Sequence, residues 1–316
     1  MIDSHEGLHG AGPPFVLSID VEEHDRIESA RGCLVSREIR QEYASRMESA
    51  THFLIDALAE RGLRATFFVV GQIAQSHPQL VRRIHEMGHE VASHGWDHRR
   101  LLEMSPAEFE IDLKTSKDAL QQVTGHEVVG YRAPTFSLVR STAWAVDILA
   151  DQGFRYDSSI YPVRHDRYGV VGAPARPFLI RGRACSLLEI PPATLCLGPF
   201  RVPVGGGGYF RILPGPLFRG AVRLTRWRRN APPTVLYFHP WEFDPTQPRL
   251  PLKPLTQWRT YVGIGAGQRR IRDLIGWIGP ECCVRAADLA SRLNANGSGL
   301  PSFRLNPQVT SLQAGE

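Results

Sequence analysis

Two histidines four residues apart, His94 and His98, are the part of the sequence best suited to metal chemistry. They follow the apolar pair Val91-Ala92, which predicts a short buried strand. A tight turn after such a strand can bring both imidazole rings to the same side, where their nitrogens suit one metal ion. The alternative is a pair of surface histidines. A catalytic metal would also require a carboxylate ligand, a base, an acid and a substrate wall.

Polar side chains stand at the ends of five predicted strands. They are Asp20 with Glu22, His94 with His98, Arg132, Asp157 and His239. Each has an ordinary structural interpretation, as a helix cap, a structural ion pair or a core histidine. Because the carboxyl ends of parallel strands meet on one face of an α/β fold, we expect these five groups to converge there.

The elements that would position these groups alternate between strand and helix. Residues 15–21 and 64–70 are apolar runs that predict buried strands. The run Ser105-Pro106-Ala107-Glu108 contains an N-cap, a first-turn proline and a capping-box glutamate, so it predicts a helix start. The alternation predicts an α/β fold with a mostly parallel sheet or a barrel.

Two histidines and one carboxylate form a metallohydrolase arrangement, in which the ion acidifies water and polarises a carbonyl. Residues 20 and 22 point to the same side of a strand, and we assign Asp20 as the base and Glu22 as the ligand. His239, kept protonated by Asp157, would serve as the acid. The aromatic residues Trp241, Phe136 and Tyr161 could stack on a sugar ring, with ordinary core packing as the alternative.

Composition predicts a soluble globular protein with one basic stretch. Hydrophobic residues make up 42% of the chain and charged residues 22%, which is ordinary for a globular protein. Residues 155–229 contain 13 arginines and three acids, so this stretch is either a solvated surface or a contact for an anionic glycan or lipid headgroup. No nucleic-acid-binding motif accompanies it, and we expect no nucleic-acid partner.

Other classes are disfavoured by what the sequence lacks. The five cysteines are odd in number and have no zinc-site spacing, so a disulfide framework is not expected. The first 14 residues contain no apolar signal core, and no apolar run reaches the length of a membrane span. These features predict a cytoplasmic location.

The motifs also carry a resemblance to a known family. In order they are Ser18-Ile19-Asp20, Ser93-His94-Gly95-Trp96-Asp97-His98, Arg132-Ala133-Pro134, Asp157-Ser158-Ser159 and Tyr237-Phe238-His239-Pro240. This series resembles the NodB-homology polysaccharide deacetylases. Two later stretches, residues 206–211 and 239–245, resemble the bacterial branch associated with exosortase and exopolysaccharide loci.

The resemblance implies a distorted (β/α) barrel, a divalent metal that is usually zinc, and hydrolysis of N-acetyl groups on amino sugars. It implies a role for each matching residue: Asp20 is the base, His94 and His98 are ligands, Arg132 orients the base, and His239 is the acid assisted by Asp157. Trp241, Phe136, Tyr161 and Pro134 are the expected substrate contacts.

One position departs from the family pattern. Most members have two adjacent aspartates in the first motif, the second being a metal ligand, whereas Val21 stands there in this chain. A carboxylate two residues after the first aspartate resembles the peptidoglycan-deacetylase and cyclic-amide-hydrolase branches. We therefore assign Glu22 as the ligand and keep Glu23 as the second choice.

The expected organisation is a catalytic domain over residues 15–245 with a Gly/Arg/Pro-rich insertion at 161–233, an extension at 246–293 and a flexible tail at 294–316. The expected function is removal of N-acetyl groups from a polysaccharide or its lipid-linked precursor. The alternatives are hydrolysis of another linear or cyclic C–N amide and a non-catalytic glycan-binding module. The glycine run 205–208 is either a lid or a structural turn.

Overall fold

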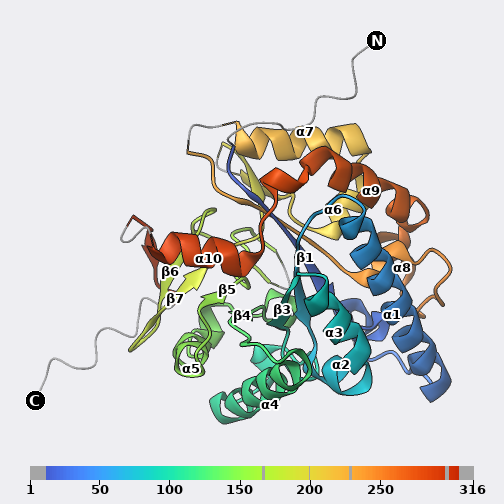
Figure 1. The fold of residues 1–316 in the computed structure, drawn as a ribbon, viewed down its shortest axis with the longest axis horizontal. Helices are drawn as coiled ribbons and strands as arrows, with labels where there is room; N and C mark the ends of the chain where they lie inside the picture. The colour runs from blue at the N-terminus through green and yellow to red at the C-terminus, as the bar shows by residue number, and fades with distance from the viewer. Residues whose placement is uncertain (1–11, 166–167, 199, 228–229, 296–298, 306–316) are drawn as a thin grey trace, which may run out of the picture.

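The fold is a mixed α/β arrangement with strands at the centre and helices around them (Figure 1). The computed structural model describes residues 12–165, 168–198, 200–227, 230–295 and 299–305. Among these residues the main sheet has nine strands, and neighbouring strands are parallel except for β6 and β7. In spatial order they are β10 (Thr234–Phe238), β1 (Phe15–Val21), β2 (Thr66–Val69), β3 (Glu90–Ser93), β4 (Gly130–Tyr131), β5 (Tyr156–Asp157), β7 (Ser186–Glu189), β6 (Phe178–Arg181) and β11 (Ser302–Phe303).

Helices connect and cover the strands, and a second short antiparallel pair, β8 (Thr194–Leu197) with β9 (Phe200–Pro203), lies outside the main sheet. The helices are α1 (Arg37–Ala59), α2 (Gly71–Ser76), α3 (Pro78–Glu86), α4 (Pro106–Thr124), α5 (Ala145–Asp151), α6 (Gly207–Ile212), α7 (Gly215–Arg226), α8 (Pro254–Tyr261), α9 (Gly267–Ile278) and α10 (Ala286–Ala295).

Local sequence signals explain where α4 begins and ends. Ser105 accepts a hydrogen bond from the backbone N–H of Glu108, whose carboxylate in turn accepts from the Ser105 N–H. The predicted capping box is therefore confirmed. Gly125 ends the helix in the left-handed conformation (φ 71°), which a glycine adopts without steric cost.

The two faces of β1 belong to different parts of the core. Phe15, Leu17 and Ile19 pack in the large cluster, whereas Val16 belongs to a second cluster. Because side chains alternate along a strand, Asp20 lies on the Val16 face. The second cluster also contains Phe68, Ala92, Tyr156, Leu188 and Val235, together with Ala286, Leu289 and Ala290 of α10. This cluster fills the inside of the curved sheet.

Helix α10 closes the amino-terminal end of that interior. The backbone N–H of Ala286 donates to the Thr66 hydroxyl, and the N–H of Ala287 donates to the Glu90 carboxylate. Thr66 and Glu90 are the first residues of β2 and β3. The opposite, carboxyl end of the strands is left for Asp20 and the other polar strand ends.

The sheet curls back toward its own edge strand, β10. The N–H of Ala193 donates to the Val235 carbonyl at 3.0 Å, and the N–H of Tyr237 donates to the Gly205 carbonyl at 2.7 Å. The predicted distorted (β/α) barrel is confirmed.

Part of the stretch expected to be an insertion, residues 161–233, belongs to the main sheet through β6 and β7. Ser302–Phe303, within the stretch expected to be a tail, pairs with β6. The rest of that tail lies partly outside the described residues. The domain boundaries stay predictions.

Candidate active site

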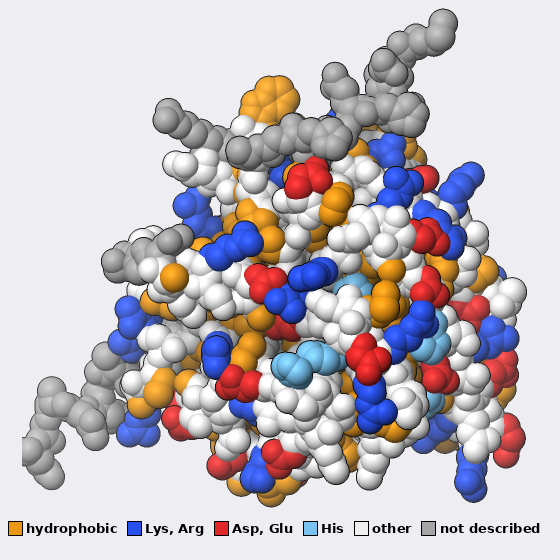
Figure 2. Space-filling model, in the orientation of Figure 1, with side chains coloured by type: hydrophobic (Ala, Val, Ile, Leu, Met, Phe, Trp, Pro, Cys, Tyr) orange, Lys and Arg blue, Asp and Glu red, His pale blue; other side chains and the backbone are white. Residues whose placement is uncertain are grey.

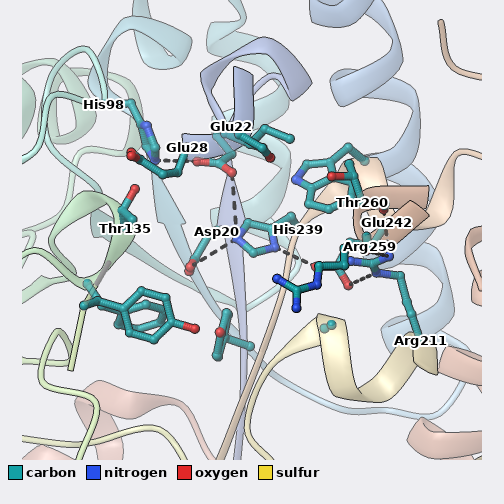
Figure 3. A pocket seen from close by; sticks show the side chains of 18 of the residues that line it. Asp20, Glu22, Glu28, His98, Thr135, Arg211, His239, Glu242, Arg259 and Thr260 are labelled. Atoms are coloured by element: carbon teal, nitrogen blue, oxygen red, sulfur yellow. Dashed lines mark hydrogen bonds and ion pairs between the residues drawn. The ribbon is translucent and has the colours of Figure 1, made fainter. Parts of the chain in front are cut away.

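A pocket of about 340 Å³ opens at the carboxyl ends of β1, β3 and β10 (Figure 3). Asp20, Glu22, His94, His98 and His239 all line it. These are five of the seven residues for which the sequence predicted catalytic or metal-binding roles. The other two, Arg132 and Asp157, are buried beneath it. The expected convergence of polar strand ends in the pocket is therefore observed for three strands, β1, β3 and β10.

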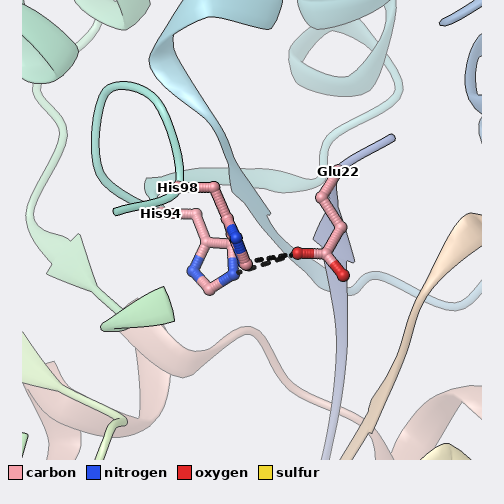
Figure 4. Close-up of side chains that lie close together, drawn as sticks. All are labelled: Glu22, His94 and His98. Atoms are coloured by element: carbon pink, nitrogen blue, oxygen red, sulfur yellow. Dashed lines mark ion pairs between the residues drawn. The ribbon is translucent and has the colours of Figure 1, made fainter. Parts of the chain in front are cut away.

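Glu22, His94 and His98 form a compact cluster (Figure 4). One ligand atom from each residue lies within 4.8 Å of the other two. Glu22 Oε2 is 2.5 Å from Nε2 of His98 and 3.9 Å from Nε2 of His94. His98 has a left-handed backbone (φ 66°), which is uncommon for a residue with a side chain and turns its ring back toward Glu22.

The ring of His94 is prepared to bind through Nε2. Its Nδ1 lies 2.8 Å from the backbone carbonyl of Arg132 and must donate, because a carbonyl only accepts. The lone pair is then on Nε2, which faces Glu22. Burial lowers the pKa of His94 to about 4, so the ring is neutral near pH 7. A neutral imidazole held by an outer hydrogen bond is the form that ligates metals.

Glu22 is the carboxylate that meets the histidines. Burial acts to raise the pKa of Glu22, but neighbouring imidazoles, that of His98 foremost, outweigh burial and hold the pKa well below its usual range. Glu23, the second choice for this role, makes a 2.5 Å ion pair with Arg26 instead. The donor set of one carboxylate and two imidazoles fits a zinc-type ion.

Asp20 lies beside this cluster and is held by Arg132. The Arg132 Nη1 atom donates to Asp20 Oδ1 at 2.6 Å and to the Ser18 hydroxyl at 2.8 Å. Its other nitrogens donate to the carbonyl and the hydroxyl of Ser158. The guanidinium also lies 4.0 Å from the ring centre of Phe68. Arg132 is therefore fixed on every side, and it fixes one oxygen of Asp20.

His239 lies among three acidic side chains at the other side of the pocket (Figure 3). Its Nε2 is 3.7 Å from Glu22 and 3.9 Å from Asp20, while its Nδ1 is 2.7 Å from Glu242 Oε1. Burial acts to lower the pKa of His239, but the hydrogen bond to Glu242 and the charge of Glu22 raise it to about 9.

The partner expected for His239 was Asp157, and the structure places Asp157 elsewhere. The Asp157 carboxylate accepts from the hydroxyl of Ser159 at 2.5 Å and from the Ser159 N–H at 3.1 Å. Burial raises the pKa of Asp157 and raises that of neighbouring Glu189 well above the usual range. Asp157 therefore organises the loop after β5, because Ser159 in turn accepts from the N–H of Ala133.

The aromatic candidates divide into two groups. Trp241 and Phe136 line the pocket, and the ring of Trp241 stacks on His239 at 5.5 Å. Tyr161 is buried behind Phe136, and its hydroxyl accepts from the Gly205 N–H. Pro134 is also buried, and neither residue is among the described residues that line the pocket. The structure therefore does not place Tyr161 or Pro134 where either could contact a sugar in the pocket.

Sequence reasoning missed Glu242 and Arg211, which both line the pocket. A signal for Glu242 was present, because Pro240–Phe243 form one turn of 3-10 helix that brings residue 242 back to His239. The glycine run was also left undecided. A Cβ at Gly206 would lie 2.4 Å from the Tyr237 hydroxyl, and one at Gly207 would lie 1.7 Å from Glu242 Oε2. Close packing explains these two glycines.

Two regions of the chain match models of known protein families. A model described as "Polysaccharide deacetylase" matches residues 42–156, and a "Domain of unknown function (DUF3473)" matches residues 158–279. Residues 42–156 of the chain therefore match the polysaccharide deacetylase family. The second matched region is no separate body, since β10 pairs with β1 and His239 lines the pocket with Asp20.

Named relatives match about a third of the chain. The peptidoglycan-N-acetylglucosamine deacetylase PgdA of Listeria monocytogenes is 36% identical over 109 residues, which cover 31% of this chain and 23% of that protein. A chitooligosaccharide deacetylase of Bradyrhizobium is 30% identical over 97 residues, covering 31% of this chain and 42% of that protein. The chain thus spans less than half the length of these relatives.

Two solved structures share the fold along almost the whole chain. A polysaccharide deacetylase-type protein from Mycobacterium smegmatis superposes with a TM-score of 0.57 at 21% identity, covering 92% of this chain and 94% of that one. A PuuE allantoinase superposes with a TM-score of 0.56 at 18% identity, covering 92% and 93%. At these identities the likeness shows the fold alone.

Proposed function

We propose that this protein is a metal-dependent hydrolase that removes N-acetyl groups from amino sugars of a polysaccharide or its lipid-linked precursor. One observation carries the proposal. A cluster of one carboxylate and two imidazoles, Glu22 with His94 and His98, shares a pocket with an arginine-held aspartate and a histidine. The relatives named above are deacetylases of N-acetylated glycans by their names, which supports the same substrate class.

Glu22, His94 and His98 would hold the ion, and zinc is the first choice because the donor set is of the zinc type. When bound, such an ion polarises the amide carbonyl and lowers the pKa of water. The exopolysaccharide setting and the cytoplasmic location stay predictions.

The chain's own residues would then move the protons. Asp20, oriented by Arg132, takes a proton from the attacking water, whose oxygen adds to the acetyl carbon. His239 gives a proton to the departing nitrogen through Nε2, which faces the pocket. The C–N bond breaks, acetate leaves, and the amine stays on the sugar. Trp241 and Phe136 offer apolar faces against which a sugar ring can stack.

Acetate release tests this proposal. The wild-type chain, reconstituted with zinc, is incubated with N-acetylglucosamine oligomers, and Asp20→Asn and a chelator-treated sample serve as controls. We expect release by the wild type alone. Ring opening of a cyclic amide without acetate release would favour the first alternative, for which the allantoinase likeness supplies a fold but no activity. Salt-sensitive glycan binding without any turnover or metal dependence would favour the glycan-binding module.

We further propose that the surface around α7 contacts an anionic membrane, where a lipid-linked substrate would be found. The α7 surface comprises Leu217, Leu224 and Trp227, which are 62%, 51% and 82% exposed. It continues onto β8 and β9 through Leu197 and Phe200. An apolar side chain stands out at the top of the view in Figure 2, where Figure 1 places α7. No helix among the described residues is long and apolar enough to cross a bilayer.

Charge favours a membrane over a second copy of the chain at this surface. The sequence from residue 190 to residue 241 contains seven arginines and no acid. Arg176 lines the same hollow as Leu224 and Trp227, and Arg219 lies on α7. Two copies meeting here would oppose arginines to arginines, whereas anionic headgroups would neutralise them. Exposed Trp and Leu could then enter the headgroup layer.

A further inference from the structure

Glu242 fixes the ring of His239 through Nδ1, the ring nitrogen that does not face Asp20 and Glu22. Glu242 Oε1 is 2.7 Å from His239 Nδ1, and the Trp241 ring stacks on the imidazole at an interplanar angle of 25°. An ionised carboxylate only accepts hydrogen bonds, so Nδ1 carries the proton. The nitrogen left facing Asp20 and Glu22 is Nε2. The contact with Glu242 thus decides which nitrogen of His239 points into the pocket.

Glu242 is held in turn by Arg211, a buried arginine of α6. The Arg211 Nε atom lies 3.5 Å from Glu242 Oε2. Its Nη1 atom donates to the backbone carbonyls of Thr260 at 2.7 Å and Val262 at 3.0 Å, where α8 ends. The planar guanidinium therefore joins one carboxylate to one helix end. Arg211 is thus fixed at the end of α8, and it meets Glu242 through an ion pair in which neither Nε of Arg211 nor Oε2 of Glu242 makes a hydrogen bond to another described residue.

Glycines allow the backbone to pack this closely around the pair. A Cβ at Gly207 would lie 1.7 Å from Glu242 Oε2, and one at Gly267 would lie 2.6 Å from the Glu242 carbonyl. Gly263 has φ +77°, and a Cβ there would lie 2.2 Å from the Arg211 carbonyl. The three glycines belong to α6, the turn after α8, and α9. Three separate segments thus pack against Glu242 and Arg211.

Arg270 adds a second connection within this assembly. From α9 its guanidinium donates to the backbone carbonyls of Arg211, at 2.9 Å, and of Leu213. Both carbonyls lie at the carboxyl end of α6, where the last carbonyls of a helix have no backbone N–H within the helix to accept from. Helix α9 thereby holds the end of α6, and α6 carries Arg211. All of these residues lie within 158–279, the region matched to a domain of unknown function.

We infer that one role of this region is to hold Glu242 against His239 through Arg211, so that Glu242 and Arg211 are positioning residues for the acid of the reaction. The inference rests on the proposed function, in which His239 protonates the leaving amine. Glu242 touches no substrate in this scheme and acts through the orientation of the His239 ring. In this arrangement the carboxylate that orients the acid is that of Glu242, three residues after His239 in the chain. Asp157 does not have this role.

A double-mutant cycle on acetate release measures the coupling. We expect Glu242→Ala to lower kcat about 10- to 100-fold with KM and bound zinc unchanged, because it disturbs the acid without removing it and so costs less than the roughly 10²–10⁴-fold that general acid catalysis contributes in full. Glu242→Gln keeps a carbonyl oxygen for Nδ1–H and should recover most of the turnover. His239→Ala with Glu242→Ala should be no slower than His239→Ala alone. Equal losses from Glu242→Ala in both backgrounds would overturn the inference.

The matched control is Glu127→Ala, which removes a 2.5 Å ion pair with Arg155 on the exposed surface. We expect its kcat to equal that of the wild type. Arg211→Lys tests the second link, because a lysine cannot contact a carboxylate and a helix end with one planar group. Its kcat should fall between those of the wild type and Glu242→Ala. A wild-type kcat for Arg211→Lys would remove Arg211 from the account.

Nitrogen-15 NMR of the histidine rings gives a readout that needs no substrate. The His239 signals are assigned by their loss in His239→Ala. We expect a slowly exchanging Nδ1–H in the wild type and in Glu127→Ala, and its loss in Glu242→Ala. With that pattern present, absence of acetate release would count against the proposed function alone. A Nδ1–H that is absent from the wild type, or that persists in Glu242→Ala, would overturn the positioning role.

Discussion

His94 and Arg132 are joined by a 2.8 Å hydrogen bond from the imidazole Nδ1 to the backbone carbonyl. The side chain of the same arginine holds Asp20 at 2.6 Å. The candidate metal ligand is thus oriented by the main chain of Arg132, and the candidate base by its side chain. Substitution of Arg132 should separate these two roles. A new side chain changes the contact with Asp20, whereas the backbone carbonyl that orients His94 stays.

Arg132→Lys should therefore abolish turnover and leave metal binding intact. A lysine cannot hold Asp20, Ser18 and Ser158 at once, so the base loses its fixed orientation. We expect kcat to fall by about 100-fold or more. Acetate release and bound zinc are measured on the same preparation. Arg155→Lys, on the exposed surface, is the control. Loss of zinc together with turnover would show that the side chain also supports the ligands.

Asp20→Asn should keep the metal and lose turnover for a different reason. The amide retains the size of the carboxylate and can still accept from Arg132, but it cannot take a proton from water. We expect the unfolding temperature and zinc content of the wild type, with acetate release near the background rate. Turnover within tenfold of the wild type would remove Asp20 as the base.

Asp112 should make stability depend on pH. Burial raises the pKa of this carboxyl to about 6, although it accepts a hydrogen bond from the Trp96 N–H. Since the folded state binds the proton more tightly than the unfolded state, this contribution is favourable below about pH 4. It is lost as pH rises through 6, and the loss amounts to about 3 kcal/mol.

Asp112→Asn removes this titration, so its stability relative to the wild type should increase between pH 4 and pH 7. Urea unfolding at several pH values measures the difference. Asp118→Asn, exposed on the same helix, is the control for replacing an aspartate of α4 by asparagine. A constant difference for Asp112→Asn would show that Asp112 titrates normally.

The α7 surface should bind vesicles of phosphatidylglycerol and phosphatidylcholine more strongly than vesicles of phosphatidylcholine alone, and salt should weaken the binding. Co-sedimentation measures the bound fraction. Leu217→Ser with Trp227→Ser should reduce it severalfold, because apolar insertion is lost. Ile111→Ser on α4, where the side chain is 66% exposed, is the matched control. Equal binding by all three proteins, or binding by none, would contradict a membrane role for α7.

Short-range patterns predicted most of the fold and the metal cluster. The alternation of β1, continued one residue past its end, placed Glu22 on the same side as Asp20, and the spacing of His94 and His98 brought both rings to Glu22. The choice of Glu22, with Glu23 second, rested on the resemblance to related branches of the family, and the structure gives Glu23 to Arg26.

Long-range contacts could not be predicted in the same way. Nothing local indicates that Arg211 would reach the end of α8, 48 to 51 residues later in the chain. Asp157 was expected beside His239 from the resemblance, but its own neighbours Ser159 and Glu189 satisfy it. The substitute, Glu242, is close in sequence, and the turn formed by Pro240–Phe243 explains its place.

The central claim is that Glu22, His94 and His98 hold a metal ion, and zinc content after reconstitution tests it most directly. The samples are the wild type, Glu22→Ala, His94→Ala and, as the matched control, Glu23→Ala. We predict about one zinc per chain in the wild type and in Glu23→Ala, and none in the other two. No zinc in any sample, or equal zinc in all four, would contradict the account.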